Sequence, residues 1–191
     1  MCGIAGILDE NHHLENQQVI FNDMIQTMKH RGPTSDGLYL EDHVALMHTR
    51  LAIVDVEKGL QPMQINEYTI IYNGECYNTE ELRHDLEEKG IVFHTSSDTE
   101  VILHAYIYYK ENCLQMINGI FAFAIYDTKE KSLFLARDPM GVKPLFYTFV
   151  DQILLFASEI KTLLAYPLVR AIIDERSIHQ IAYLGPGRIS G

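Results

Sequence analysis

Cys2, the second residue of the chain, becomes a complete nucleophile if Met1 is removed. Cysteine is small enough for the initiator methionine before it to be cleaved, which leaves a thiol and a free α-amine on one residue. In model compounds the amine titrates at about 7.7–8.0 and the thiol at about 8.5. Such an amine is well matched to taking the thiol proton, as in other N-terminal nucleophiles. A lone cysteine is equally common as a small buried residue, so Cys2 alone leaves both interpretations open.

Asn73 and Gly74 could supply the oxyanion hole that a nucleophile attacking a carbonyl needs. The asparagine offers a side-chain amide donor, and the glycine offers a backbone N–H that a substrate can approach closely. The same dipeptide is a common hairpin turn, and its spacing alone favours the turn.

Three charged residues could recognise the α-carbon end of an amino acid. Arg50 is expected at the end of a strand, where a guanidinium can hold a carboxylate through two parallel hydrogen bonds. Asp98, with Glu75 beside it, could accept the ammonium group. Each has a plainer alternative: a surface ion pair for Arg50, a helix-capping role for Asp98 and a solvated turn for Glu75.

Short strands with helices between them must position these residues. The apolar run at residues 4–8 predicts a core strand that starts just after Cys2. Further strands are predicted at residues 38–40, 44–51, 68–72, 119–126, 132–136, 145–149 and 153–157. Helices are predicted at residues 14–29, 78–89, 101–109, 158–165 and 177–184, with a turn at 34–37 and capping boxes at 78–81 and 97–100. This order indicates an α+β fold with antiparallel sheets.

Bulk composition narrows the classes of function. A chain of 191 residues suits one domain, and its formal net charge of −11 argues against nucleic-acid and anionic-membrane surfaces. No apolar run approaches the ~18–20 residues of a membrane span, and the N-terminus lacks a signal-peptide pattern. The 3 cysteines are widely spaced, which indicates free thiols in a reducing, cytoplasmic compartment. No pair of cysteines or histidines has metal-ligand spacing, so no metal is expected.

A series of short motifs, in order from Cys2 to about Pro167, resembles the N-terminal glutaminase domain of the asparagine synthetases. These are class II glutamine amidotransferases of the N-terminal-nucleophile hydrolase type. The motifs are MCGIAGI (1–7), KHRGP (29–33), HTRLAIVD (48–55), QPM (61–63), YNGE (72–75), SDTE (97–100), NGIFAF (118–123), RDPMGVKPL (137–145) and ASEIK (157–161). Amidotransferases that act on sugar phosphates carry an Arg-Trp-Ala-Thr-His-like stretch where this chain has residues 50–55. One departure is Thr34, where the family often has an acidic residue after Arg-Gly-Pro.

The resemblance implies a four-layer αββα sandwich with two antiparallel sheets. It assigns Cys2 as the nucleophile, the α-amine of Cys2 as the base, and Asn73 and Gly74 as the oxyanion hole. It assigns the following residues to glutamine binding: Arg50, Leu51, Ala52, Ile53, Val54, Glu75 and Asp98. Cys76 and Cys113 are expected to be inert structural thiols.

The activity implied is hydrolysis of L-glutamine to glutamate and ammonia through a thioester, without a cofactor. In a full-length enzyme this ammonia would serve the ATP-dependent amidation of aspartate to asparagine. The resemblance makes residues 1–191 a type 2 amidotransferase domain, with a core at about 1–170. Residues 171–191 would start the connection to a C-terminal synthetase domain, which would use Mg-ATP. A second copy of the chain, as a homodimer, is the other candidate partner.

Two other classes remain as alternatives. One is a non-catalytic module that keeps the fold, which the intact set Cys2, Arg50, Asn73, Gly74 and Asp98 disfavours. The other is an N-terminal-nucleophile hydrolase acting on a different amide, which the paired charges of Arg50 and Asp98 disfavour.

Overall fold

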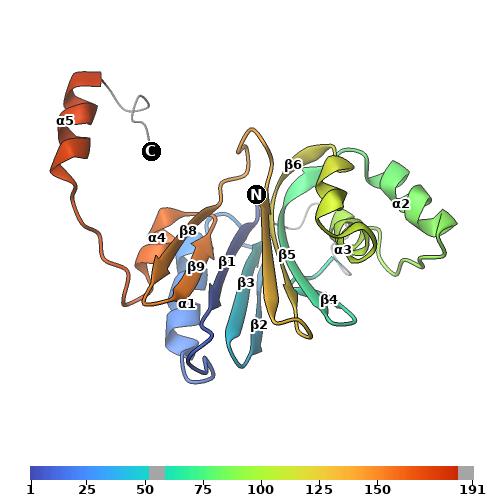
Figure 1. Cartoon of the computed structure of the whole chain (residues 1–191), viewed down its shortest axis with the longest axis horizontal. Coiled ribbons are helices and arrows are strands. Elements are labelled where there is room, and N and C mark those ends of the chain that lie inside the picture. The colour runs from blue at the N-terminus through green and yellow to red at the C-terminus, as the bar shows by residue number, and fades with distance from the viewer. Residues whose placement is uncertain (52–58, 185–191) are drawn as a thin grey trace.

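Two antiparallel β-sheets face each other and helices cover their outer faces (Figure 1). The computed structural model describes residues 1–51 and 59–184. The α+β prediction and the αββα sandwich are therefore confirmed.

In the described residues, the first sheet has five strands in the order β2-β3-β1-β9-β8. Its strands are β1 (Gly3–Leu8), β2 (Ser35–Glu41), β3 (Val44–Arg50), β8 (Phe146–Val150) and β9 (Ile153–Ala157). The apolar sequence of β1 is explained by its central place, because both of its edges pair with neighbours and both of its faces are covered. Gly3 lies opposite Thr49 at one end of this pairing, so Cys2 enters the sheet at the end of β3 that carries Arg50.

The second sheet has four strands within residues 1–51 and 59–184, in the order β4-β5-β6-β7. They are β4 (Met63–Ile65), β5 (Tyr68–Cys76), β6 (Gly119–Asp127) and β7 (Ser132–Arg137). Strand β4 pairs only with residues 68–70 of β5, whereas β6 pairs with β5 along its whole length. Beyond residue 70, the edge of β5 opposite to β6 therefore forms hydrogen bonds with side chains and not with β4.

The helices separate the core into layers. Helix α1 (Gln18–Met28) and helix α4 (Ile160–Leu164) lie on the five-stranded sheet, and α1 buries Phe21, Met24, Ile25 and Met28 against it. Helix α2 (Thr79–Glu88), helix α3 (Asp98–Tyr109) and the 3₁₀ helix η1 (Lys110–Gln115) lie on the four-stranded sheet. A third apolar cluster, which includes Ile4, Leu46, Ile71 and Phe156, fills the space between the sheets.

The structure corrects two predictions about local elements. The predicted turn at 34–37 is wrong, because Ser35, Asp36 and Gly37 belong to β2 and pair with β3. The predicted helix at 14–29 begins only at Gln18, since Leu14 is buried in the preceding turn. The other predicted strands and helices are present with shifted ends.

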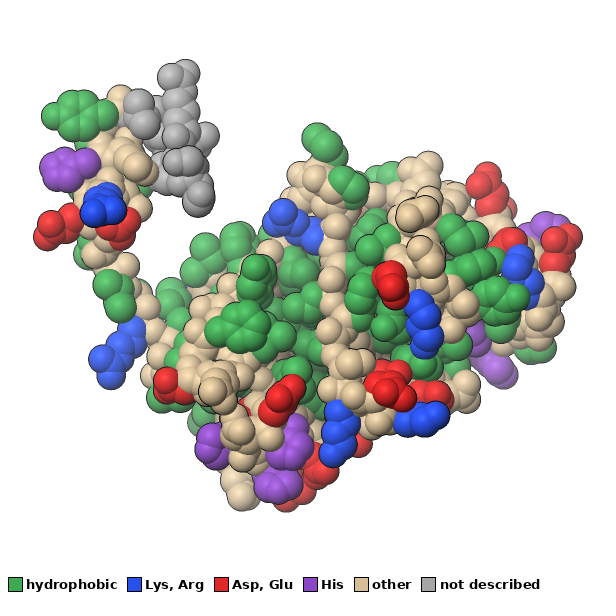
Figure 2. Space-filling model, in the orientation of Figure 1, with side chains coloured by type: hydrophobic (Ala, Val, Ile, Leu, Met, Phe, Trp, Pro, Cys, Tyr) green, Lys and Arg blue, Asp and Glu red, His purple; other side chains and the backbone are tan. Residues whose placement is uncertain are grey.

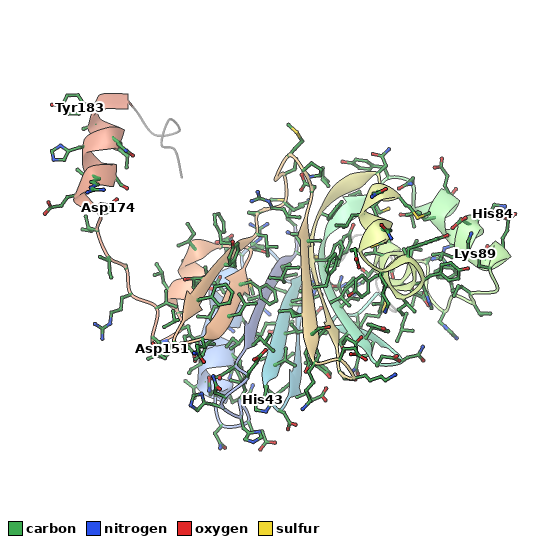
Figure 3. The ribbon with its side chains drawn as sticks, in the orientation of Figure 1. His43, His84, Lys89, Asp151, Asp174 and Tyr183 are labelled. Carbon is green, nitrogen blue, oxygen red and sulfur yellow. The ribbon has the colours of Figure 1, made fainter. Side chains whose placement is uncertain are left out.

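The last described helix, α5 (Glu175–Leu184), stands away from the sheets (Figure 1). Tyr183 on this helix is 85% exposed and points away from the rest of the molecule (Figure 3). Apolar side chains also gather over β8 and β9, where Tyr147 and Phe149 are exposed (Figure 2). Within the described residues, no helix is long and apolar enough to cross a membrane.

Candidate active site

One cavity of about 700 Å³ brings the predicted site residues together. It lies where the ends of β1 and β3 meet β5 and the start of α3. The predicted residues that line it are Cys2, Arg50, Leu51, Asn73, Gly74, Glu75 and Asp98. Ala52, Ile53 and Val54 lie outside the described residues. Side chains far apart in the sequence, from both sheets, therefore share one space.

Cys2 is partly buried at the entry to β1, and its thiol is free. Met1 lines the same cavity and is 58% exposed. With Met1 attached, the nitrogen of Cys2 is an amide and cannot act as a base. Removal of Met1 would create the α-amine inside the cavity, directly beside the thiol.

Asn73 and Gly74 lie inside strand β5, so the alternative of a hairpin turn is wrong. Both residues pair with β6, Asn73 opposite Ala122 and Gly74 opposite Phe121. The side chain of Asn73 is buried, and its Nδ2 has no hydrogen-bond partner among the described residues. A buried amide donor without a partner is costly, which is expected where a ligand supplies the acceptor.

The N–H of Gly74 faces the same edge of β5 as the N–H groups of Tyr72 and Cys76, because alternate residues of a strand point their N–H groups the same way. Tyr72 N–H donates to Gln61 Oε1 at 2.6 Å and Cys76 N–H donates to Asp98 Oδ2 at 3.3 Å. Between them, Gly74 presents its N–H along the edge that lines the cavity. A Cβ at this position would lie 2.6 Å from Ile120 O, so only glycine fits.

Arg50 ends strand β3 and is 6% exposed. Its carbonyl accepts a hydrogen bond from Thr34 N–H at 3.0 Å, which joins the end of β3 to the loop after α1. A buried guanidinium on the cavity wall, rather than a surface ion pair, is the environment expected for a residue that holds a carboxylate.

Asp98 is the first residue of α3, and its carboxylate is held by the four-stranded sheet. Tyr72 Oη donates to Asp98 Oδ2 at 2.9 Å. Burial is the main cause that raises the pKa of Asp98 above its ordinary value, and the negative charge of Glu75 adds to this, while the hydrogen bonds from Tyr72 and Cys76 oppose it. Glu75 itself is exposed at the rim of the cavity. Of the two carboxylates, Asp98 is thus the deeper and the more firmly held.

Ser97 caps α3 as predicted, but the capping box is only half formed. Ser97 Oγ accepts from Glu100 N–H at 3.4 Å. The Glu100 carboxylate reaches further back and accepts from His94 N–H at 2.8 Å and Thr95 N–H at 2.7 Å. The capping box predicted at 78–81 is absent, because Asn78 Oδ1, the atom that would cap α2, accepts from Asn118 N–H at 2.9 Å, while Nδ2 donates to Met116 O.

The sequence analysis assigned no role to three further residues that line the cavity. Gln61 joins the sheet to α3, since its Oε1 accepts from Tyr72 N–H and its Nε2 donates to Thr99 Oγ1 at 3.1 Å. Tyr72 holds Asp98. Lys143, only 8% exposed, adds a positive charge to the wall, which favours anions formed there. Gln61, Tyr72 and Lys143 all stand within the motifs quoted above, which was the available signal.

His48 connects the two sheets behind the cavity. Its Nε2 donates to Tyr72 O at 3.3 Å, one residue before Asn73. Burial is the main cause that lowers the pKa of His48 to about 3, and the charge of Arg50 also lowers it. The imidazole therefore stays neutral at neutral pH and serves as a structural link between β3 and β5.

The two other cysteines are buried, in agreement with a structural role. Burial raises the pKa of the Cys76 thiol, and it raises the pKa of Cys113 to about 11. Residues 1–51 and 59–184 contain no cluster of three or more histidine, cysteine or acidic side chains that could hold a metal ion.

Two facing antiparallel sheets between helical layers, with a cysteine at the start of a central strand, define the N-terminal-nucleophile hydrolase architecture. The solved structure of the glutamine phosphoribosylpyrophosphate amidotransferase from B. subtilis has this fold, with a TM-score of 0.72 and 25% sequence identity. The match covers 86% of this chain and 43% of that one.

The particular family follows from the sequence comparisons. The chain belongs to the glutamine amidotransferase domain family, whose model matches residues 1–187. It is 47% identical to asparagine synthetase (glutamine-hydrolyzing) 3 of Bacillus subtilis, over 100% of this chain and 32% of that protein. It is 40% identical to asparagine synthetase (glutamine-hydrolyzing) 3 of Arabidopsis thaliana, over 85% of this chain and 28% of that protein. The chain thus spans about a third of the length of these curated relatives.

Proposed function

We propose that this domain hydrolyses L-glutamine to glutamate and ammonia, with Cys2 as the nucleophile. The observation that carries the proposal is the buried Asn73 amide, which lacks a partner among the described residues and lines the same cavity as Cys2. A donor of this kind is suited to an oxygen that becomes negatively charged during the reaction.

In the proposed mechanism the α-amine of Cys2 takes the thiol proton, and the thiolate attacks the side-chain amide carbon of glutamine. Asn73 Nδ2 and Gly74 N–H stabilise the tetrahedral oxyanion. Collapse of this intermediate breaks the C–N bond, while the protonated amine of Cys2 gives its proton to the departing ammonia. Water then hydrolyses the γ-glutamyl thioester and releases glutamate. The thiol and the amine supply all the proton transfers, so the proposal requires no metal or organic cofactor in this domain.

Two opposite charges on the cavity wall would select for a free amino acid. Arg50 would hold the α-carboxylate, with Leu51 on the same cavity wall. Asp98 would accept the α-ammonium, and Glu75 would add negative charge at the rim. A peptide or protein amide lacks this pair of charges, which is the feature that distinguishes glutaminase activity from hydrolysis of other amides.

The larger proposal concerns the whole protein. The relatives are glutamine-hydrolysing asparagine synthetases about three times as long as this chain. We therefore propose that ammonia made here serves a synthetase domain of the same protein. That domain would amidate aspartate with Mg-ATP in the cytoplasm. Such a domain, or a second copy of the chain, is a suitable partner for the exposed apolar residues of β8 and α5.

The decisive experiment measures ammonia release from glutamine by the purified chain, together with the intact mass of the protein. The chain without Met1 should release ammonia, and Cys2→Ala should abolish the release because no nucleophile remains. Cys113→Ala, which removes a buried thiol far from the cavity, is the matched control and should keep the activity. Glutaminase activity that persists in Cys2→Ala would contradict the mechanism, and activity in a protein that retains Met1 would exclude the α-amine as base.

A further inference from the structure

The segment after β9 holds β1 along the edge opposite to β3. Ser158, which is fully buried, exchanges two hydrogen bonds with Ile4: Ser158 N–H donates to Ile4 O at 2.8 Å, and Ile4 N–H donates to Ser158 Oγ at 3.0 Å. These bonds extend the β1–β9 pairing by one position beyond Ala5 and Ala157. The next residue along, Glu159, lies close to Cys2.

Glu159 is connected to Cys2 through a single arginine. Arg31 Nε donates to the carbonyl oxygen of Cys2 at 3.0 Å, and Arg31 Nη1 donates to Glu159 Oε1 at 3.0 Å. The Arg31 side chain is 9% exposed and the Glu159 side chain 20%. Because a guanidinium is planar and rigid, fixing one of its nitrogens also fixes the direction of the others. The position of the Cys2 carbonyl therefore depends on the position of the Glu159 carboxylate.

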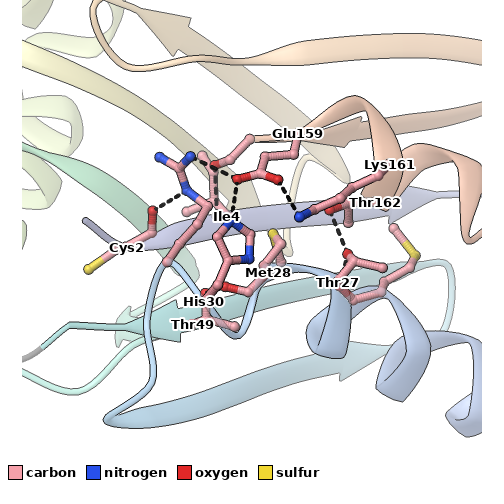
Figure 4. Close-up of polar contacts among 12 residues, drawn as sticks. Cys2, Ile4, Thr27, Met28, His30, Thr49, Glu159, Lys161 and Thr162 are labelled. Carbon is pink, nitrogen blue, oxygen red and sulfur yellow. Dashed lines mark hydrogen bonds and ion pairs between the residues drawn. The ribbon is translucent and has the colours of Figure 1, made fainter.

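The main chain and the thiol of Cys2 face different surroundings. The carbonyl of Cys2 points toward Glu159, and its thiol points away from Glu159 (Figure 4). The loop that carries Arg31 is also tightly seated, because a Cβ on Gly32 would lie 2.3 Å from the Thr49 carbonyl carbon. Cys2 is thus held at its main chain while its reactive atoms remain free.

Glu159 is itself held in place and ionised. Lys161 Nζ lies 3.0 Å from Oε2, and His30 Nε2 lies 2.9 Å from Oε1 (Figure 4). Partial burial opposes ionisation, but the hydrogen bonds from Arg31, Lys161 and His30 dominate and lower the pKa of Glu159 to about 2. The carboxylate is therefore charged throughout the neutral range.

We propose that Glu159 is a positioning residue for the nucleophile, acting through Arg31 on the carbonyl of Cys2. This inference rests on the proposed glutaminase function. The carbonyl, the thiol-bearing carbon and the α-amine of Cys2 share one Cα, so a shift of the carbonyl moves the thiol relative to Asn73 and Gly74. Substrate contacts at Arg50 and Asp98 do not involve Glu159. Loss of Glu159 should therefore reduce kcat and leave KM for glutamine nearly unchanged.

The test compares the wild-type chain without Met1 with Glu159→Gln and Lys161→Met. Glu159→Gln keeps the size of the side chain but removes the charge that orders Arg31, and kcat should fall between about 10-fold and 100-fold, as expected for a small misplacement of a reacting atom. KM should change by less than about 3-fold, because bound substrate touches other residues. Lys161→Met is the matched control. The Lys161 side chain is 53% exposed and contacts Oε2, so its loss leaves the contacts of Arg31 and His30 with Oε1 in place, and kcat should stay within about 2-fold of wild type.

A second measurement separates positioning from a general loss of structure. The rate of Cys2 labelling by a chloroketone analogue of glutamine, which reacts only in a bound orientation, should fall in Glu159→Gln. Labelling by iodoacetamide, which needs no bound orientation, should not fall. If Glu159→Gln does not fold, Glu159→Asp, which shortens the reach to Arg31, should show the same pattern.

A folded variant with wild-type kcat, or an equal loss in Lys161→Met, would overturn the inference. So would a variant in which KM rises while kcat is unchanged. A wild-type chain that neither hydrolyses glutamine nor reacts with the chloroketone would instead contradict the proposed function.

Discussion

The two walls of the cavity are built in different ways. The wall from the five-stranded sheet carries Cys2 and Arg50, and its contacts join distant parts of the chain: Ile4 bonds to Ser158, 154 residues away, and Arg31 to Glu159, 128 residues away. The wall from the four-stranded sheet carries Asn73, Gly74 and Asp98. Its contacts are much more local, with separations of 26 residues for Tyr72 to Asp98 and 11 for Gln61 to Tyr72.

We call the wall from the four-stranded sheet the local wall and the wall from the five-stranded sheet the distant wall. The local wall carries the groups proposed to bind the oxyanion and the ammonium. The hydrogen bonds that hold Asp98 and one edge of β5 lie within residues 61–99, while the other edge of β5 pairs with β6. The distant wall places the nucleophile, and it is complete only when β9 and the residues after it have packed against β1. We therefore expect substitutions on the local wall to change individual kinetic constants, and substitutions that anchor the distant wall to change stability or kcat.

Asn73→Ala should have the largest effect of the substitutions on the local wall. It removes the side-chain donor of the proposed oxyanion hole, and loss of one such donor typically lowers kcat by about 100-fold to 1,000-fold. KM should change little, because the donor acts mainly on the negative oxygen of the intermediate. Steady-state kinetics of ammonia release measure both constants. A loss confined to KM would assign Asn73 to ground-state binding and remove the oxyanion role.

Asp98→Asn should have a smaller effect, on substrate binding. Replacing the carboxylate that is proposed to accept the ammonium should raise KM for glutamine by about 10-fold to 100-fold, the strength of a hydrogen bond to a charged group. Glu75→Gln, at the exposed rim, is the control and should raise KM much less. Equal effects of the two substitutions would contradict the assignment of Asp98 as the main acceptor.

The proposed role of Asp98 also predicts that KM for glutamine depends on pH, and Asp98→Asn tests this. Asp98 binds an ammonium only when it is charged, and its pKa is raised above the ordinary value of 3.8. As pH falls through this raised pKa, the carboxylate is protonated and KM of the wild type should rise. In Asp98→Asn, KM should be high at every pH and this acid limb should be missing. An unchanged acid limb in the variant would show that another group causes it.

Ser158→Ala should have the smallest kinetic effect but a clear effect on stability. It leaves the buried Ile4 N–H without its acceptor, which costs about 1–3 kcal/mol of unfolding free energy. Urea denaturation measures this loss. Ser97→Ala on the local wall removes a helix cap and a hydrogen bond with Thr95 Oγ1, with an expected cost of about 1 kcal/mol, and serves as the comparison. A smaller cost at Ser158 than at Ser97 would contradict the distinction between the two walls.

How far the sequence predicts this molecule depends on the range of the contacts involved. Apolar runs predicted the strands and the α+β class well, because a strand that is buried on both faces needs consecutive apolar residues, which is a local property of the chain. The Asn73-Gly74 pair has a strong turn propensity, yet it lies in β5, because pairing with β6 along nine positions outweighs that preference. The predicted turn at 34–37 failed for the same reason, since pairing with β3 extends β2 to Ser35.

The candidate site shows the same limit. The motifs located Cys2, Arg50, Asn73, Gly74 and Asp98, and all of them line one cavity. Motifs could not indicate that Tyr72 donates to Asp98 or that Glu159 holds Arg31, because these contacts form only when separate segments pack together. Asn78 shows the opposite error. Its local sequence pattern predicted a helix cap, but its side chain forms a long-range hydrogen bond with Met116.

Met1, on the wall of the cavity beside Cys2, connects the chemistry to protein maturation. On the proposed mechanism, activity depends on an aminopeptidase and not only on folding. A preparation could be fully folded, with a single melting transition, and still contain inactive molecules that retain Met1. The specific activity would then be proportional to the fraction of molecules that have lost Met1. A purification tag placed before Cys2 would block the reaction unless its removal left Cys2 as the first residue.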